Sequence, residues 1–244
     1  MMQKFNFRLN TEKEFMRVLR AVARNFKKIL EKYIDKKTGE IKDLAGFLGA
    51  CEKYSIKLSP WAEKECQKIL ARVDAQNAAD WRRAVPMLNS EVSAQIGAAA
   101  AKDLLFEQVA LIKSLPLEAA QKAQSLAAEA MAGGERAAAI VGGILDLGAA
   151  TEARAMLIAR TEIAKANATF TRVRADAAGV THYVWRTVGD EKVRSAHYIL
   201  DGEIFEFASP PDVEGEGAHH PGEFPNCRCY AEPIILNESL NERK

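Results

Sequence analysis

Residues 151–187 read TEARAMLIARTEIAKANATFTRVRADAAGVTHYVWRT, and the pattern changes within them in a way that decides the fold. Up to Arg174 the stretch is rich in residues that favour helix, such as Ala, Glu, Leu and Arg. Gly179 has the position of a glycine just past a helix end. The residues that follow, 181–187, alternate and are rich in β-branched and aromatic side chains, which predicts a strand.

Helical patterns dominate the chain before this point. Apolar residues recur at three- and four-residue steps over residues 11–34, which indicates an amphipathic helix. Strong helix formers continue from Ser90 to Arg174. We expect helices over 11–34, 41–54 and 59–83. Further along the chain we expect a helix start at Leu115-Pro116, a turn at Gly133-Gly134, an interruption at Gly142-Gly143, a stop at Leu147-Gly148 and a last helix capped by Thr151.

A small sheet is expected after Gly179. Residues 204–207 and 229–235 favour strands, and Pro233 places the second of these at a sheet edge. Residues 209–226 are rich in proline and glycine and predict a long loop. The predicted fold class is therefore α+β, mostly α, with a helical N-terminal two thirds followed by a small α+β C-terminal module.

Length and composition exclude several classes of protein. The chain has 244 residues, of which 48% are hydrophobic and 27% charged, which is typical of a globular protein and not of a disordered one. No run approaches the roughly 18 apolar residues of a membrane helix. Residues 1–8 lack the apolar stretch of a secretory signal, and four cysteines do not make a dense disulfide framework. We expect a protein of a reducing cytoplasm without membrane association.

Charge is distributed unevenly along the chain. Residues 1–50 carry 12 Lys+Arg and 6 Asp+Glu, a balance of +6, whereas residues 201–244 carry 3 Lys+Arg and 10 Asp+Glu, a balance of −7. A basic N-terminal helix suits contact with nucleic acid or with an acidic partner. The interleaving of Lys and Arg with Glu and Phe favours an ordinary solvated helix face, and a local contact with DNA stays open.

The first candidate site lies in residues 190–202, DEKVRSAHYILDG. We expect Asp190 to cap a short helix, with Arg194 and His197 four and seven residues further on and on the same face. Such a set suits acid–base chemistry or phosphate binding. A structural network is favoured, because no convincing nucleophile lies nearby in the sequence.

The second candidate site is Cys227-Arg228-Cys229. In an extended segment residues i and i+2 point to the same side, so both thiolates can reach one metal ion, whereas a disulfide over so short a span would be strained. His197 and His220, with His219 beside it, are the candidates that would complete a zinc site. The alternative is that both cysteines are small buried residues of a strand. A metal here would be structural and would hold the long loop to the strand.

The third candidate is Arg160-Thr161-Glu162, in the middle of the last long helix. Arg160 and Glu162 are two residues apart and do not face each other, so their partners must come from elsewhere, for which the C-terminal module is the candidate. The alternative is that both are exposed helix charges. The sequence contains no Gly-rich phosphate loop, no Gly-x-Ser-x-Gly and no His-Glu-x-x-His motif.

Taken in order, these pieces resemble the phage Mu F-like head morphogenesis (minor capsid) family. The resemblance covers residues 105–235 and implies helices over 105–178 and an α+β module over 179–235, preceded by a variable helical region over 1–104 and followed by a flexible tail over 236–244. The matching residues are Ala159, Arg160, Thr161, Glu162, Trp185, Arg186, Thr187, Asp190, Val193, Arg194, His197, Leu200, Asp201, Gly202 and Asn226-Cys227-Arg228-Cys229.

The resemblance implies a non-enzymatic minor head protein of a tailed phage or prophage. It would be made in the bacterial host cytoplasm and carried in the virion, in association with the portal protein and the capsid interior, and in some cases with packaged DNA. Arg160, Glu162, Asp190, Arg194 and His197 would then tie the last helix to the C-terminal module, while Cys227 and Cys229 hold the loop.

Two other functions fit the residues. One is a small nuclease or phosphodiesterase, with His197 as acid or base and with Arg160 and Arg194 as phosphate clamps. The other is a DNA-binding module that works through residues 1–50, whose binding would fall steeply with salt. No cofactor is expected apart from the candidate structural zinc.

Overall fold

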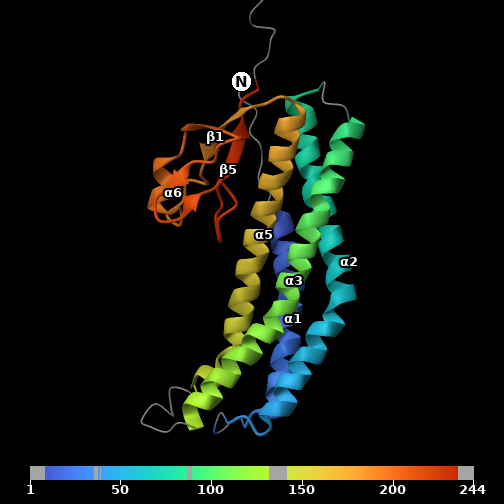
Figure 1. The fold of residues 1–244 in the computed structure, drawn as a ribbon, viewed down its shortest axis with the longest axis vertical. Coiled ribbons are helices and arrows are strands. Elements are labelled where there is room, and N and C mark those ends of the chain that lie inside the picture. The colour runs from blue at the N-terminus through green and yellow to red at the C-terminus, as the bar shows by residue number, and fades with distance from the viewer. Residues whose placement is uncertain (1–8, 36–37, 39, 87–89, 132–141, 236–244) are drawn as a thin grey trace, which may run out of the picture. The chain divides into compact units, whose positions relative to one another are not determined.

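A computed structural model describes residues 9–35, 38, 40–86, 90–131 and 142–235 (Figure 1). Long helices fill the N-terminal two thirds, and short strands and one short helix follow, which confirms the α+β, mostly α, fold class. The predicted turn at Gly133-Gly134 lies outside the described residues. The long helices are α1 (Leu9–Tyr33), α2 (Leu44–Ala84), α3 (Ser90–Met131) and α5 (Leu147–Ala177).

The predicted helix breaks at two prolines are wrong. Pro60 lies inside α2 and Pro116 lies inside α3, and both helices continue through them. A proline in a helix interior costs about 3 kcal/mol because it removes a hydrogen bond and clashes with the preceding turn. Burial of neighbouring side chains, such as Ala62 beside Pro60 and Leu115 beside Pro116, offsets that cost.

The start of the last helix also differs from the prediction. Helix α5 begins at Leu147 and not at Thr151, and the hydroxyl of Thr151 donates to the Leu147 carbonyl at 2.7 Å, one turn back inside the helix. Residues 142–145, which include the glycines expected to interrupt the helix, are themselves helical.

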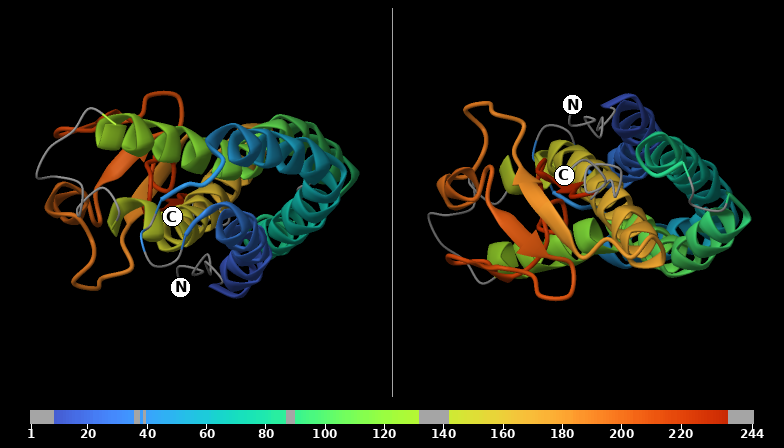
Figure 2. Two further views of the ribbon diagram at one scale, coloured as in Figure 1. Left: turned by 90° about the horizontal axis from the view of Figure 1, so that it is seen from below. Right: turned by 90° about the horizontal axis from the view of Figure 1, so that it is seen from above.

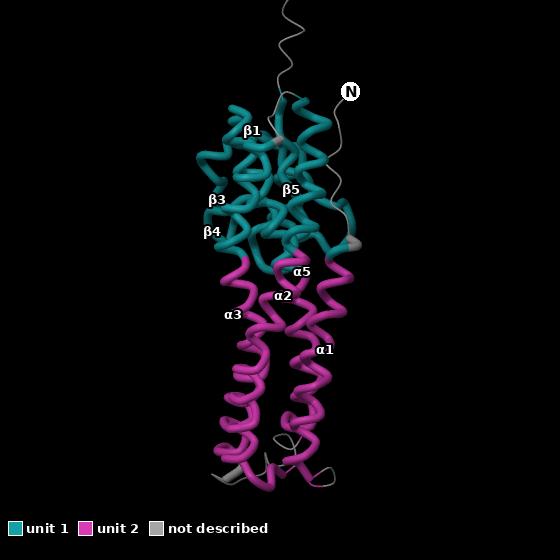
Figure 3. The backbone as a smooth tube through the Cα atoms, turned by 90° about the vertical axis from the view of Figure 1, so that its right-hand side faces the viewer, with its two compact units in different colours: residues 1–11, 70–104, 160–244 teal, residues 12–69, 105–159 magenta. Residues whose placement is uncertain are grey.

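The chain divides into two compact units (Figure 3), and α2, α3 and α5 each contribute residues to both. Unit 2 comprises residues 12–69 and 105–159, where parts of α1, α2, α3 and α5 lie side by side (Figure 2). Its apolar stripes meet in a core made of Phe26, Leu30, Ile34, Phe47, Cys51, Ala119, Ala120, Ala123, Leu126, Ile144 and Leu147.

Unit 1 comprises the described parts of residues 1–11, 70–104 and 160–244. Its helices are joined by a buried polar network around Arg174, whose side chain is 0% exposed. The guanidinium donates to Asp74 at 2.5 Å, to Asn77 at 2.9 Å and to the Ser93 hydroxyl at 2.9 Å. Arg174, Asn77 and Ser93 are buried and Asp74 is partly exposed, and because each of these groups has a partner, the network fixes how the three helices meet.

The strands of unit 1 begin directly after α5. Strand β1 (His182–Arg186) lies between β2 (Ile204–Glu206) and β5 (Tyr230–Pro233) in an antiparallel sheet, in which Val184 pairs with Ile204 and Trp185 with Ala231. The expected edge position of the last strand is confirmed. The remaining elements are α6 (Ser195–Ile199), β3 (Asp212–Val213) and β4 (Gly217–Ala218). Strands β3 and β4 pair with each other inside residues 209–226, which were expected to form a loop throughout.

Among the described helices, none combines the length and the apolar character that crossing a membrane requires.

Candidate functional site

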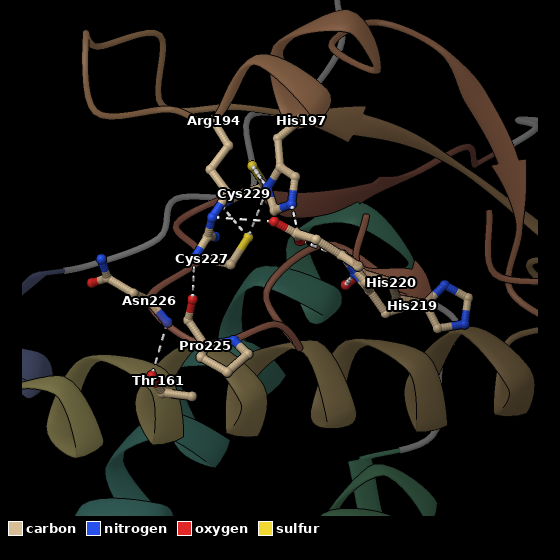
Figure 4. Close-up of polar contacts among 10 residues, drawn as sticks. Thr161, Arg194, His197, His219, His220, Pro225, Asn226, Cys227 and Cys229 are labelled. Carbon is tan, nitrogen blue, oxygen red and sulfur yellow. Dashed lines mark hydrogen bonds and ion pairs between the residues drawn. The ribbon is translucent and has the colours of Figure 1, made fainter. Parts of the chain in front are cut away.

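The side chain of His197 lies at the centre of the C-terminal module (Figure 4). It projects from the short helix α6 and is 1% exposed, with the Trp185 indole packed edge-on against the imidazole at 5.4 Å between ring centroids. Its Nδ1 lies 3.4 Å from the sulfur of Cys227 and 3.5 Å from that of Cys229. Both sulfurs belong to residues that are 2% exposed. The structure therefore brings together three of the four candidate metal ligands.

The fourth candidate, His220, lies elsewhere. Its Nδ1 is 3.0 Å from the hydroxyl of Tyr183, and burial holds the pKa of this imidazole below its ordinary value. Among the described residues, neither group of clustered metal-ligating side chains includes His220. The neighbouring His219 instead approaches the far side of the His197 site.

Glu216 occupies that far side, and sequence patterns did not identify it. Its Oε2 accepts from His197 Nε2 at 2.8 Å and lies 3.2 Å from His219 Nε2, while its Oε1 lies 3.1 Å from Arg194 Nε. Burial opposes ionisation of Glu216, but His197 and Arg194 outweigh it and lower the pKa of the carboxyl. Because a carboxylate only accepts hydrogen bonds, it fixes the proton of the neutral His197 ring on Nε2.

The pKa values of the two thiols shift in opposite directions although both sulfurs face the His197 ring. The pKa of Cys227 is lowered chiefly because the Cys229 thiol donates a hydrogen bond to its sulfur, and the pKa of Cys229 is raised because it donates that bond and because it is buried. The backbone N–H of Cys229 also donates to the Cys227 sulfur at 3.4 Å. One negative charge is thus favoured on this pair, at Cys227.

The segment before the cysteines is fastened to α5. The backbone N–H of Asn226 donates to the Thr161 hydroxyl at 2.9 Å, and Arg160 donates to the Asn226 side-chain oxygen at 2.7 Å. Asn226 has a positive φ of 62°, a conformation that asparagine tolerates better than most residues. Glu162, the third motif residue, is buried in the same helix. Arg160 and Thr161 thus meet the C-terminal module, as the hypothesis of a helix-to-module tie requires.

The expected helix cap by Asp190 is wrong. Helix α6 begins after Arg194, whose side chain makes no capping bond, and Asp190 lies in the preceding turn, where it accepts from the Lys192 N–H at 3.0 Å. Its carboxylate instead receives two hydrogen bonds of 2.5 Å from Arg228, the residue between the cysteines. Asp190 therefore holds the cysteine segment from outside and does not share a cluster with His197.

The remaining motif residues shape the return from α6 to the sheet. Asp201 accepts from the Thr187 N–H at 2.7 Å, and the Gly202 N–H donates to the Trp185 carbonyl at 2.9 Å. Gly202 has a φ of 91°, which a side chain would strain. Arg194 also contacts the segment that precedes the cysteines, since its guanidinium donates to the Pro225 carbonyl at 2.8 Å.

Comparison with known proteins agrees with this assembly of motifs. Residues 121–232 match the family described as Phage Mu protein F like protein. A protein of Haemophilus influenzae described as an uncharacterized protein is 34% identical over 191 residues, which is 72% of this chain and 40% of that protein. The chain thus spans less than half the length of this relative. No solved structure matches the chain. Residues 121–232, which include α5 and the surroundings of His197, belong to the Phage Mu protein F like family, as their motifs predicted.

Proposed function

We propose that this chain is a minor structural protein of a tailed-phage or prophage head. It is made in the bacterial cytoplasm and enters the virion, where it associates with the portal protein and the capsid interior. The observation that carries this proposal is the family match over residues 121–232, since that family points to phage head morphogenesis. The same residues contain the tie between α5 and the C-terminal module.

The surroundings of His197 favour a structural role over the alternative of a nuclease. An acid–base catalyst must reach its substrate, whereas this imidazole is 1% exposed and both of its ring nitrogens face protein groups. Arg160 and Arg194, the supposed phosphate clamps, are bonded to Asn226 and Pro225. We therefore propose a non-enzymatic protein.

A deletion in the producing phage or prophage tests this function. We expect in-frame removal of the coding sequence to lower the yield of infectious particles and of intact heads seen by electron microscopy, and we expect the wild-type chain supplied in trans to restore both. Unchanged yield and infectivity would contradict the proposal. Cleavage of double-stranded DNA by the purified wild-type chain, absent in His197→Ala, would favour the nuclease instead.

Contact with packaged DNA is the finer part of the proposal. Helix α1 carries exposed basic residues at helical spacing, so that they form one stripe along its surface. Such a stripe follows a phosphate backbone without reading its sequence. The stripe consists of Lys13, Arg17, Arg24, Lys28 and Lys32.

Charge reversal with a matched control tests the contact. We expect Arg17→Glu, Arg24→Glu and Lys28→Glu together to weaken DNA binding and to reduce the slope of log K against log salt by up to about 2.7, if each residue meets one phosphate. The control variant changes Lys53, Lys57 and Lys64 to Glu. These lysines are exposed on α2, and the two sequence intervals between them are those of the α1 variant in the opposite order. Equal losses in both triple variants would show that α1 has no special role.

A further inference from the structure

Two sulfurs converge on one ring nitrogen in the C-terminal module. His197 Nδ1 lies 3.4 Å from Cys227 Sγ and 3.5 Å from Cys229 Sγ, and all three atoms lie within 4.8 Å of one another. An imidazole nitrogen has either one proton to donate or one lone pair to offer. A simple two-centre hydrogen bond accounts for one of these two contacts, whereas a shared cation accounts for both with one lone pair on the nitrogen.

The separations also fit tetrahedral zinc. Zinc–sulfur bonds of about 2.3 Å and zinc–nitrogen bonds of about 2.0–2.1 Å at the tetrahedral angle place sulfur and nitrogen about 3.5 Å apart. The two observed distances of 3.4 and 3.5 Å agree with that value. Soft thiolates combined with one imidazole are a donor set that favours zinc over magnesium or calcium.

The second ring nitrogen of His197 has the kind of partner that a metal-bound histidine has. His197 Nε2 donates to the Glu216 carboxylate at 2.8 Å, which leaves the lone pair of the neutral ring on Nδ1, the nitrogen that faces the sulfurs. A metal-bound histidine usually has this kind of carboxylate partner on its second nitrogen. Arg194 holds Glu216 in turn, with Nε 3.1 Å from Oε1.

We propose that His197, Cys227 and Cys229 bind one structural Zn²⁺ ion through Nδ1 and the two sulfurs, with Glu216 as the residue that positions His197. Among the described residues no fourth histidine, cysteine or carboxylate joins this cluster, so these three side chains supply three of the four positions around a tetrahedral ion. The ion links α6 to the segment that Thr161 fastens to α5.

The second group of clustered side chains, formed by His197, Glu216 and His219, is the less suitable site. The Arg194 guanidinium lies against the same carboxylate, so a cation there would face a positive charge 3.1 Å from Glu216 Oε1. It would also compete for His197 Nε2, which already has its carboxylate partner.

Metal analysis of the full chain purified from zinc-supplemented cells tests the proposal. We expect about one zinc per chain in the wild type, as for a structural site, and loss of the zinc in Cys227→Ser, Cys229→Ser and His197→Gln. The matched controls Cys51→Ser and His220→Gln should retain it, because neither residue belongs to the cluster. A wild-type chain without zinc, or equal loss in His220→Gln and His197→Gln, would overturn this ligand set.

A spectroscopic measurement on the wild type does not depend on the folding of any variant. After removal of zinc by a chelator, Co²⁺ should give a thiolate-to-cobalt charge-transfer band and the strong visible bands of tetrahedral coordination. A cobalt spectrum without the charge-transfer band would overturn the proposal. For Glu216→Gln we expect the same band but an affinity about 10–100-fold lower, the effect of losing a positioning partner. Unchanged affinity in Glu216→Gln would show that Glu216 does not position the ligand.

Discussion

Thr161, in the middle of α5, accepts a hydrogen bond of 2.9 Å from the backbone N–H of Asn226, the residue that precedes Cys227 (Figure 4). A helix residue and a loop residue that are 65 positions apart in the sequence thus share one bond. This bond gives a physical role to two short motifs, because residues 159–162 supply its acceptor and residues 226–229 supply its donor.

The first prediction concerns that bond. Thr161→Val keeps the shape of the side chain but leaves the Asn226 N–H without its acceptor, so we expect a loss of about 1 kcal/mol in the free energy of unfolding. Thermal denaturation should show it as a melting temperature lower by about 2–4 °C. Thr169→Val, a half-buried substitution on the same helix, is the control. Equal melting temperatures for the Thr161→Val variant and the wild type would contradict the role of this bond.

The second prediction concerns the buried network at Arg174. Arg174→Ala removes the partner of Asp74, Asn77 and Ser93 at once, and we expect it to destabilise the protein by about 3–5 kcal/mol. Urea denaturation measures the change. In the control, Arg172→Ala removes a longer, more exposed ion pair of 3.7 Å with Glu223 and should cost less than about 1 kcal/mol. Similar urea midpoints for Arg174→Ala and Arg172→Ala would contradict a special contribution of the buried network to stability.

A third prediction concerns pH. Hydrogen bonds from Arg228 hold the pKa of the Asp190 carboxyl below its ordinary value, so the pair stabilises the fold above the unfolded-state pKa of about 3.9 and loses this effect as the pH falls further. We expect Asp190→Asn to have a lower melting temperature than the wild type at pH 7, and the difference to close below about pH 4. Asp176→Asn, at an exposed position of α5, is the control. A difference that persists unchanged at pH 3 would exclude this mechanism.

The fourth prediction concerns Cys51, which is fully buried in the core of unit 2. Burial raises the pKa of this thiol to about 12, so the reactive thiolate is scarce at neutral pH and reagents do not reach it. We expect iodoacetamide at pH 8 to leave Cys51 unmodified in the native chain and to alkylate it in guanidinium, as measured by mass spectrometry of its peptide. Rapid alkylation in the native chain would show that this core opens.

Local patterns were sufficient to predict the three-stranded sheet, but not the short paired strands β3 and β4, which lie where a loop was expected. The predicted strands at 181–187, 204–207 and 229–235 correspond to β1, β2 and β5, because each combines β-forming residues with flanking turn residues. Pro60 and Pro116 misled the helix prediction, since their local cost is real but is outweighed by packing of their helices against neighbours far away in the sequence.

The centre of the candidate site was only partly predictable. Cys227 and Cys229 stand out by their spacing, and His197 stands out as one of only four histidines. Glu216 is one acidic residue among several in its loop, and only the fold brings its carboxylate to His197. Gly215 and Gly217, both at positive φ, surround it, and this tight turn is the single local signal that marks Glu216.

The most direct test of the proposed head function is quantitative mass spectrometry of purified heads from a phage or induced prophage that encodes this chain. Copies of the chain are counted against copies of the portal protein. We predict a fixed, low ratio to portal that survives further purification of the heads. Absence of the chain from particles, together with its abundance in the lysate that produced them, would contradict the proposal that it is a component of the head.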